Sequence, residues 1–342
     1  MAMAQSSPAS SYNFTTLDPP GSKFTMAIGV SGNAVVGTYE DANGAEHGFV
    51  YNGSAYTNLD VPGARWNECD GISGSTIVGT YYGSSGVNHG FIYNGSTFTT
   101  LDVPGTFGTI VTGISGGTVV GYYADGAFNT HGFIYNGSTF TTLDFPEAHQ
   151  GPSQGTIICG LSDGTLVGYY TSNTLYPETT SYEDRGFIYD GSTFTTLSFP
   201  NSEDTRALAV SGGTVVGTYG GTQGFIYDGS TFTTLIVPNG GNTTPNGICG
   251  NTVVGSYVDG YGTFHGFVVQ VSEPLARISL TTSNTLVVSW PYPATGWKLQ
   301  QNSDLTPTNW VTPTQTIAHD GTNNFIIVQP SSDKMFFRLS QP

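Results

Sequence analysis

Positive charge is scarce in this chain. Its 342 residues include 8 Lys and Arg against 24 Asp and Glu, a formal net charge of −16. So few basic residues do not hold a phosphate backbone or an anionic membrane surface, and neither nucleic acid nor a membrane is expected as a partner. Long apolar runs are absent too, since none approaches the roughly 20 residues of a membrane-spanning helix. Aromatic residues are abundant, with 20 Tyr and 20 Phe, which argues against a disordered chain.

Cysteine is also rare. The chain has Cys69, Cys159 and Cys249, and no CxxC or CxxH spacing that would indicate a metal site. We interpret all three as small buried hydrophobic residues. Residues 1–11 lack the apolar segment of a signal peptide. The low charge and the many Gly, Thr, Ser, Asn and Tyr residues are nevertheless typical of exported bacterial proteins, so we predict a secreted or periplasmic location.

The balance of acidic and basic residues differs between two parts of the chain. Four of them precede residue 271, and from there on four acidic and four basic residues balance. A step in composition of this kind indicates a domain boundary, which we place near Val271–Pro274. We therefore predict one domain over residues 12–270 and a second over residues 275–342.

An internal repeat dominates the first domain. The segment HGFIYNGSTFTTLDVPG (89–105) recurs along it, and successive copies start 42, 42, 54, 38 and 42 residues apart. A second unit, ISGGTVVGYY (114–123), lies with its relatives between the copies. A period of about 42 residues is that of a four-stranded β-propeller blade. The other copies begin at His47, His131, Arg185, Gln223 and His265, the last of which stops after five residues.

Each repeat is predicted to form four short strands. The first is IVTGIS (110–115), and a Ser-Gly-Gly turn leads to the second, TVVGYY (118–123). A variable loop precedes the third, HGFIY (131–135), and Asn-Gly or Asp-Gly closes a hairpin into the fourth. A tyrosine ends the second strand of every repeat. We interpret it as part of a packing layer, with a ring of sugar-stacking residues as the alternative.

One fourth strand is out of order. NFTTLD (13–18) stands alone near the N-terminus, whereas the third strand at Gly266 has no fourth strand after it. Placing residues 13–18 beside that strand completes a sixth blade and removes two free sheet edges. We therefore predict an all-β fold, a six-bladed β-propeller closed by its N-terminal strand.

A second pattern supports this closure. Wherever the residue that opens the third strand is His, the residue that closes the fourth strand is Asp, and blades four and five lose both. The two positions face each other across a hairpin, so we expect a His–Asp hydrogen bond with a structural role. A His-lined metal site is not expected, because the copies lie in separate blades. The predicted pairs are His47–Asp60, His89–Asp102, His131–Asp144 and His265–Asp18.

These motifs resemble the HAF-type repeats of bacterial extracellular β-propellers, in which His, a small residue and Phe follow a Gly-rich strand. The motif reads HGF in four repeats, with departures at Arg185 and Gln223, and the resemblance covers roughly residues 12–270. It implies the repeat architecture and export, with no activity to carry over. Residues 275–342, with LQQNSDLTPTNW (299–310) and MFFRL (335–339), are similar to the C-terminal β domains of secreted proteins from verrucomicrobial-type bacteria.

The second domain is predicted to be a small immunoglobulin- or fibronectin-like β-sandwich. Four segments read as strands between Pro, Asn and Gly turns. We expect Trp290, Trp297 and Trp310 to belong to its core rather than to a ligand platform. The predicted strands are 286–290, 297–301, 325–330 and 336–340.

Candidate functional residues lie in the irregular loops of the propeller. The loops that join successive blades share one face with those between second and third strands, and propeller ligands bind at that channel mouth. Residues 40–46 and 171–184 are the irregular loops of the second kind. An aromatic ring near Arg, Glu and Asp suits a polar ligand such as a sugar. The candidate ligand-binding residues are Arg65, Trp66, Glu68, Asp70, Glu147, His149, Asp204 and Arg206.

Two functions follow from these candidates. The first is a propeller that binds a glycan or a partner protein at the channel mouth, which we expect to be a monomer. The alternative is a glycan-active enzyme. A hydrolase would pair Glu68 or Asp70 with Glu147 or Asp204, and a lyase would use a Tyr or His base with an Arg. No cofactor is expected, although calcium in an Asp-containing loop such as 40–46 stays open.

Overall fold

The computed structural model of the chain describes residues 12–175, 182–271, 276–281, 285–291, 298–304, 309–319, 323–328 and 334–340. Residues 1–11, Trp297 and most of the boundary segment 271–274 lie outside this set. The described residues contain strands, turns and no helix. Among them, no helical segment has the length and apolarity needed to cross a membrane. The chain divides into two compact units, and the first ends at Val271.

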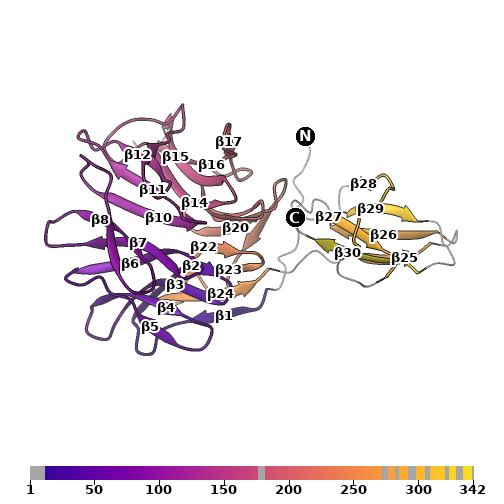
Figure 1. Ribbon diagram of the computed structural model, residues 1–342, viewed down its shortest axis with the longest axis horizontal. Helices are drawn as coiled ribbons and strands as arrows, with labels where there is room; N and C mark the ends of the chain where they lie inside the picture. The colour runs from indigo at the N-terminus through magenta and orange to yellow at the C-terminus, as the bar shows by residue number, and fades with distance from the viewer. Residues whose placement is uncertain are drawn as a thin grey trace. The chain divides into compact units, whose positions relative to one another are not determined.

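Six four-stranded sheets make up the first unit, and they surround a common centre (Figure 1). Five of these sheets are formed by four consecutive strands each. Their strands are β2 (Phe24–Ser31), β3 (Ala34–Glu40), β4 (Glu46–Tyr51) and β5 (Tyr56–Asn58); β6 (Trp66–Ser73), β7 (Thr76–Tyr82), β8 (Asn88–Tyr93) and β9 (Phe98–Leu101); β10 (Thr109–Ser115), β11 (Thr118–Ala124), β12 (Thr130–Tyr135) and β13 (Phe140–Thr142); β14 (Thr156–Ser162), β15 (Thr165–Leu175), β16 (Tyr182–Tyr189) and β17 (Phe194–Leu197); and β18 (Thr205–Ser211), β19 (Thr214–Tyr219), β20 (Gln223–Tyr227) and β21 (Phe232–Leu235).

The remaining sheet joins the two ends of this unit. It orders β1 (Phe14–Leu17) beside β24 (Phe264–Gln270), then β23 (Thr252–Val258) and β22 (Thr243–Cys249). β1 pairs antiparallel with β24, with Leu17 opposite Gly266. Leu17 is 3% exposed, and Phe14 meets Phe267 edge-on at 5.3 Å between ring centroids. Each sheet is called a blade below, numbered one to five from β2 onward, and this one is blade six.

The core lies between neighbouring blades. Each third strand supplies the Phe of its repeat motif to this core, and all six rings are fully buried. A Gly of the second strand makes room for each ring. At Gly79, an added Cβ would lie 2.0 Å from the carbonyl oxygen of Glu68 and 2.8 Å from Phe91. Only glycine therefore lets β7 approach β6 this closely. The six rings are Phe49, Phe91, Phe133, Phe187, Phe225 and Phe267.

Contacts between the innermost strands run from blade to blade, and β22 also contacts β2. Blades of four strands around one axis define a β-propeller. One loop differs from expectation. The sequence predicts a loop over 171–184, but β15 continues to Leu175 and β16 starts at Tyr182, with these two residues paired. Thr and Tyr favour extended backbone, which lets this hairpin of blade four lengthen.

The second unit, described by itself, contains two sheets and a small core. The core consists of Val288, Trp290, Leu299 and Ile326, so Trp290 is buried as predicted. The guanidinium of Arg338 lies 4.3 Å from the centre of the Trp310 ring. One sheet orders β25 (Arg277–Leu280), β26 (Leu286–Pro291), β29 (Asn323–Val328) and β28 (Ala318–His319); the other pairs β27 (Lys298–Asn302) with β30 (Phe336–Ser340).

Candidate functional site

Bulges in the innermost strands shape the central channel. The register between first and second strands shifts in five of the blades, and the skipped residue lies in the wall of a channel cavity of about 70 Å³. Strands of all six blades line this cavity. The residue types differ from blade to blade although the backbone position is the same, so the propeller's symmetry is broken here. The skipped residues are Ile28, Asp70, Thr112, Cys159 and Asn246.

Blade two places two acids on β6, and Asp70 lines the channel cavity. Glu68 and Asp70 are half-buried and lie on either side of the fully buried Cys69. Burial and then the charge of Glu46 raise the pKa of Glu68. Burial and then the charge of Glu68 raise the pKa of Asp70 well above its usual range, and hydrogen bonding with Thr80 opposes this only in part. Asp70 Oδ2 is shut off from solvent and has no hydrogen-bond partner.

Blades three and four add two tyrosines that the sequence analysis missed. Tyr122 pairs with Ile110 in the sheet, and Tyr169 pairs with Ile157. Burial, followed by the charges of Cys159, Asp70 and Glu68, raises the pKa of Tyr122 to about 12. Tyr122 is therefore a neighbour of the acid pair. The signal was in the repeat: the residue after the second-strand Gly is Thr or Ser in four blades and Tyr in these two.

Blade five contributes an ion pair. Arg206 Nη2 lies 2.7 Å from Asp184 Oδ2, and its guanidinium lies 5.0 Å from the centre of the Tyr169 ring. Burial raises the pKa of Asp204, with Arg206 opposing the shift. The predicted residues Asp204 and Arg206 thus belong to a cluster of blades four and five. The charge of Glu46 raises the pKa of Glu68, and the pairing of Glu68 or Asp70 with Glu147 or Asp204 stays a prediction.

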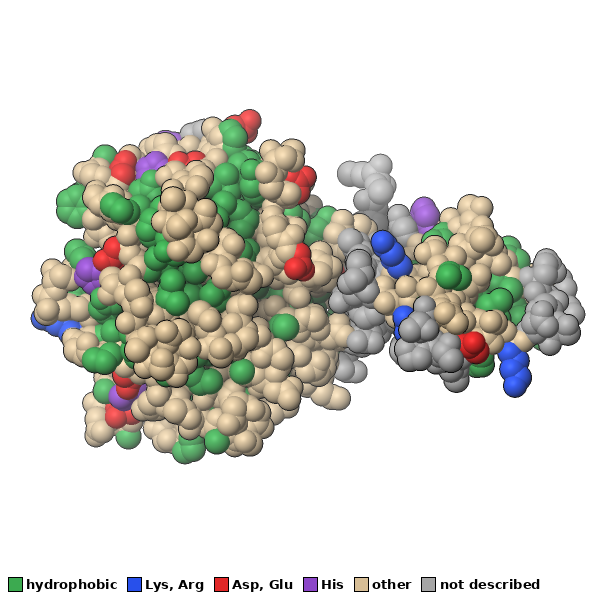
Figure 2. Space-filling view, in the orientation of Figure 1, with side chains coloured by type: hydrophobic (Ala, Val, Ile, Leu, Met, Phe, Trp, Pro, Cys, Tyr) green, Lys and Arg blue, Asp and Glu red, His purple; other side chains and the backbone are tan. Residues whose placement is uncertain are grey.

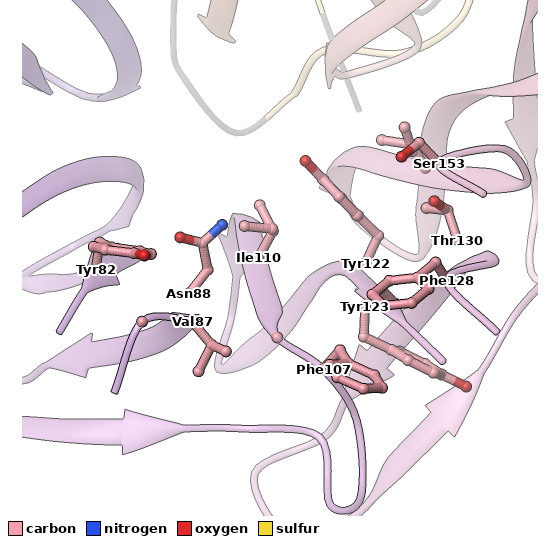
Figure 3. A pocket seen from close by; sticks show the side chains of 14 residues that line it. Tyr82, Val87, Asn88, Phe107, Ile110, Tyr122, Tyr123, Phe128, Thr130 and Ser153 are labelled. Atoms are coloured by element: carbon pink, nitrogen blue, oxygen red, sulfur yellow. The ribbon is translucent and has the colours of Figure 1, made fainter. Parts of the chain in front are cut away.

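An open cleft of about 590 Å³ lies across blades two, three and four. Figure 3 shows Tyr82 and Asn88 on one side of it and the rings of Phe107, Tyr122 and Phe128 on the other. Tyr122 lines the cleft, and the charges of Asp70 and Glu68 are among the causes that raise its pKa. The cleft is lined by Tyr82, Gly86, Val87, Asn88, Phe107, Gly108, Ile110, Tyr122, Tyr123, Ala124, Phe128, Thr130, Ser153 and Ile157.

Aromatic side chains of this cleft are exposed to solvent. Phe107 and Phe128 are each 51% exposed, and their ring centroids lie 4.8 Å apart. Trp66 stacks on Tyr82 with ring planes 2° apart and centroids 6.0 Å apart. Trp66 also precedes Glu68 by two residues on the same strand face. This predicted aromatic therefore connects the cleft to the acid pair.

Phe128 occupies a backbone position that favours glycine. Its φ is 65°, in the left-handed region, within a turn in which its N–H donates to Asp125 O at 3.0 Å. The corresponding turns of blades one and six have the same hydrogen bond and place Gly44 (φ 87°) and Gly262 (φ 88°) there. A left-handed conformation costs a residue with a Cβ about 1–2 kcal/mol. Blade three thus retains a large aromatic at a strained position where its siblings have glycine, which indicates a function for the ring.

Histidine–aspartate pairs lie around the rim of the propeller. His Nδ1 lies 2.9, 2.8, 2.7 and 2.7 Å from the Asp carboxylate in blades one, two, three and six. Figure 2 shows histidines beside carboxylates at several points of this rim. The repeated tyrosine stacks on each of these histidines at 5.2–5.3 Å, which is a packing role. In blades four and five, the rings of Phe145 and Phe199 stack on that tyrosine instead.

The other predicted site residues lie on loops. Arg65 and Glu147 are exposed, and His149 is half-buried with its backbone N–H donating to Thr171 O at 2.7 Å. Asp41 belongs to the loop 40–46, for which the sequence leaves calcium binding open. Its carboxylate accepts hydrogen bonds from the backbone N–H groups of Asn43 and Ala45. In the described part of the chain, no group of three or more His, Cys, Asp and Glu side chains is placed to hold a metal ion.

Six four-stranded sheets around a central channel define the chain as a β-propeller protein. No protein-family model matches it, and the comparison with curated proteins finds no match. Among solved structures, the β-propeller domain of the trilobed protease from Pyrococcus furiosus is similar over 73% of this chain and 95% of its own, with 11% identity and a TM-score of 0.45. A six-bladed, fucose-recognising lectin from Aleuria aurantia is similar over 88% of this chain and 97% of its own, with 13% identity and a TM-score of 0.43.

Proposed function

We propose that this protein binds a carbohydrate in the cleft across blades two, three and four, at the mouth of a six-bladed ring that β1 closes. The exposed pair of Phe107 and Phe128 carries the proposal. Sugar C–H groups stack on aromatic faces, and a cleft of this size accommodates a short oligosaccharide. Asn88 and the hydroxyls of Tyr82 and Thr130 line the cleft as hydrogen-bonding groups for sugar hydroxyls.

The ligand is proposed to be an uncharged glycan. Three carboxyl groups, of Glu46, Glu68 and Asp70, interact at this end of the mouth. The two guanidinium groups of blades four and five, from Arg185 and Arg206, are already paired with Glu183 and Asp184. The net charge of −16 adds a repulsive field for anionic polymers. We also propose that the protein acts after export, in the periplasm or outside the cell, where such glycans are found, and that residues from 275 onward form a separate small β-sandwich.

Substitution of Phe128 by glycine tests the binding site at an exposed side chain. Phe128→Gly restores the residue that the sibling turns contain, so the unfolding free energy should stay unchanged or rise by up to about 1 kcal/mol. Loss of the stacking ring should weaken glycan binding about tenfold or more. A glycan array would identify the ligand, and calorimetry would measure the affinity of the wild type and the variant.

The matched control is Tyr261→Ala. Tyr261 is 96% exposed in the sibling turn of blade six and lies outside the cleft, so this variant should bind as the wild type does. The proposal is wrong if no glycan binds, or if Phe128→Gly binds a captured glycan with unchanged affinity. Equal losses in the two variants would place the ligand elsewhere on the propeller.

A further inference from the structure

The junctions between successive blades differ in one residue of the first strand. Each first strand has a buried Thr or Asn near its start, which is Thr109 in blade three. The residue just before it takes what we call the junction position, where the strand meets the preceding blade. Gly108 holds this position in blade three, and a Cβ built on it would lie 3.4 Å from the carbonyl oxygen of Asn88 in blade two. The equivalent residues of the other blades are Phe24, Trp66, Gly155, Asp204 and Asn242.

A side chain occupies the junction position in four of the blades, and in two of them it is aromatic. The ring of Phe24 in blade one meets the ring of Phe264 in blade six, with 5.1 Å between the centroids. The ring of Trp66 in blade two stacks on Tyr82. Asn88 is the counterpart of Phe264, because each directly precedes the His of an HGF motif. The junction of blades two and three thus has a glycine and an asparagine where that of blades six and one has two aromatic rings.

The two glycines at the junction position differ in what surrounds them. A Cβ on Gly155 would overlap the carbonyl oxygen of Thr130, and these two residues form a β-bridge, so backbone closes the junction of blades three and four there. The three atoms nearest to a Cβ on Gly108 all belong to Asn88, at 3.4–3.8 Å, which is ordinary contact. Gly108 and Asn88 also both line the cleft. The missing side chain of Gly108 therefore leaves space that belongs to the cleft.

We propose that Gly108 determines the specificity of the cleft, and that one uncharged pyranose ring of the ligand takes the place that an aromatic side chain holds at the sibling junctions. This inference rests on the proposed carbohydrate binding. A pyranose ring is close to an aromatic ring in size, and its C–H faces pack on apolar surfaces. The ring lies against Asn88, whose amide donates to and accepts from sugar hydroxyls. The next sugars of the chain extend along the cleft to Phe107 and Phe128.

The test fills this space and measures the affinity for neutral oligosaccharides by calorimetry. The probes are the cello-, manno- and xylo-oligosaccharides of two to six units that the wild type binds. Gly108→Trp introduces the residue that blade two has at the junction position and should weaken binding about tenfold or more, whereas Gly108→Ala should weaken it less. Gly260→Trp is the control, because Gly260 is an exposed residue of blade six with no atom within 4 Å of its Cβ. Neither glycine has a left-handed φ, so both accept a side chain without backbone strain.

The outcomes separate this inference from the function on which it rests. Thermal melting shows whether each variant is folded, and Gly108→Leu replaces Gly108→Trp if the larger side chain prevents folding. Wild-type affinity in a folded Gly108→Trp or Gly108→Leu overturns the inference, and the binding function still stands if Phe128→Gly has lost the same glycan. Equal losses in Gly108→Trp and Gly260→Trp also overturn it, because the effect is then not local to the cleft. Absence of any bound glycan refutes the proposed function and this inference with it.

Discussion

The proposed closure of the ring by β1 leads to a quantitative prediction about a single leucine. Leu17 ends β1 and is 3% exposed, and it lies opposite Gly266 in β24. Leu101 is its counterpart in blade two, 6% exposed and opposite Gly90. Truncating a buried leucine to alanine removes about 2–5 kcal/mol through lost burial and the cavity left behind. If β1 is an integral strand of blade six, Leu17→Ala and Leu101→Ala should lose similar amounts within this range.

Urea unfolding followed by circular dichroism measures both losses, and Thr15→Ala is the control. Thr15 is an exposed residue of the same strand, so its truncation should change the unfolding free energy by less than about 0.5 kcal/mol. The reasoning is refuted if Leu17→Ala behaves like the Thr15 variant while Leu101→Ala loses its full amount. That result would mean that β1 does not pack against β24 in solution, and that blade six has a free edge.

Two further predictions concern pH. Burial lowers the pKa of His131 and His265, but hydrogen bonds and charges of two aspartates outweigh it and raise the pKa of each above its usual value near 6.5. The stability that these pairs contribute is therefore complete below about pH 6.5 and is lost as the pH rises through the higher folded value. The midpoint of urea unfolding should therefore fall as the pH rises above about 6.5, and it should fall less in the double variant His131→Gln/His265→Gln. An equal fall in both proteins would contradict the stabilising role of the two protonated histidines. Asp70 has a raised pKa, so it destabilises the fold increasingly as the pH rises above about 3.9, its unfolded value. Asp70→Asn should thus melt progressively higher than the wild type between pH 4 and pH 8, and a constant or negative difference would show that Asp70 is ionised and satisfied in the native state.

The repeat allowed most of the scaffold to be predicted. A period near 42 residues, Asn-Gly and Asp-Gly hairpins and a Gly-Phe strand in each copy indicate blades, because these signals are local and act through strand geometry. The His–Asp positions were also readable, since two residues at the ends of a hairpin face each other. The four pairs occur at 2.7–2.9 Å. The loop predicted over 171–184 was too long, because the preference of Thr and Tyr for extended backbone does not show by itself how far β15 and β16 extend.

The candidate site was predicted only in part. Trp66, Glu68 and Asp70 were named from their unusual loop, and for a hydrolase Glu68 or Asp70 was paired with Glu147 or Asp204, which stays a prediction. Which loops meet depends on how the blades pack around the axis, and that is a property of distant contacts. Phe107 and Phe128 were missed because a single aromatic in a variable loop carries no signal until its neighbours and its φ are known.

The sequence by itself thus determined the elements that local periodicity encodes: all-β blades, their hairpins and the repeated His–Asp ties. The tertiary structure decided which side chains share the mouth. In it, the charge of Glu46 from blade one raises the pKa of Glu68 in blade two, and the charge of Asp70 helps to raise the pKa of Tyr122 in blade three. The bulge that turns Asp70 into the channel belongs to the pairing of β6 with β7, and the burial that alters its chemistry comes from all six blades together.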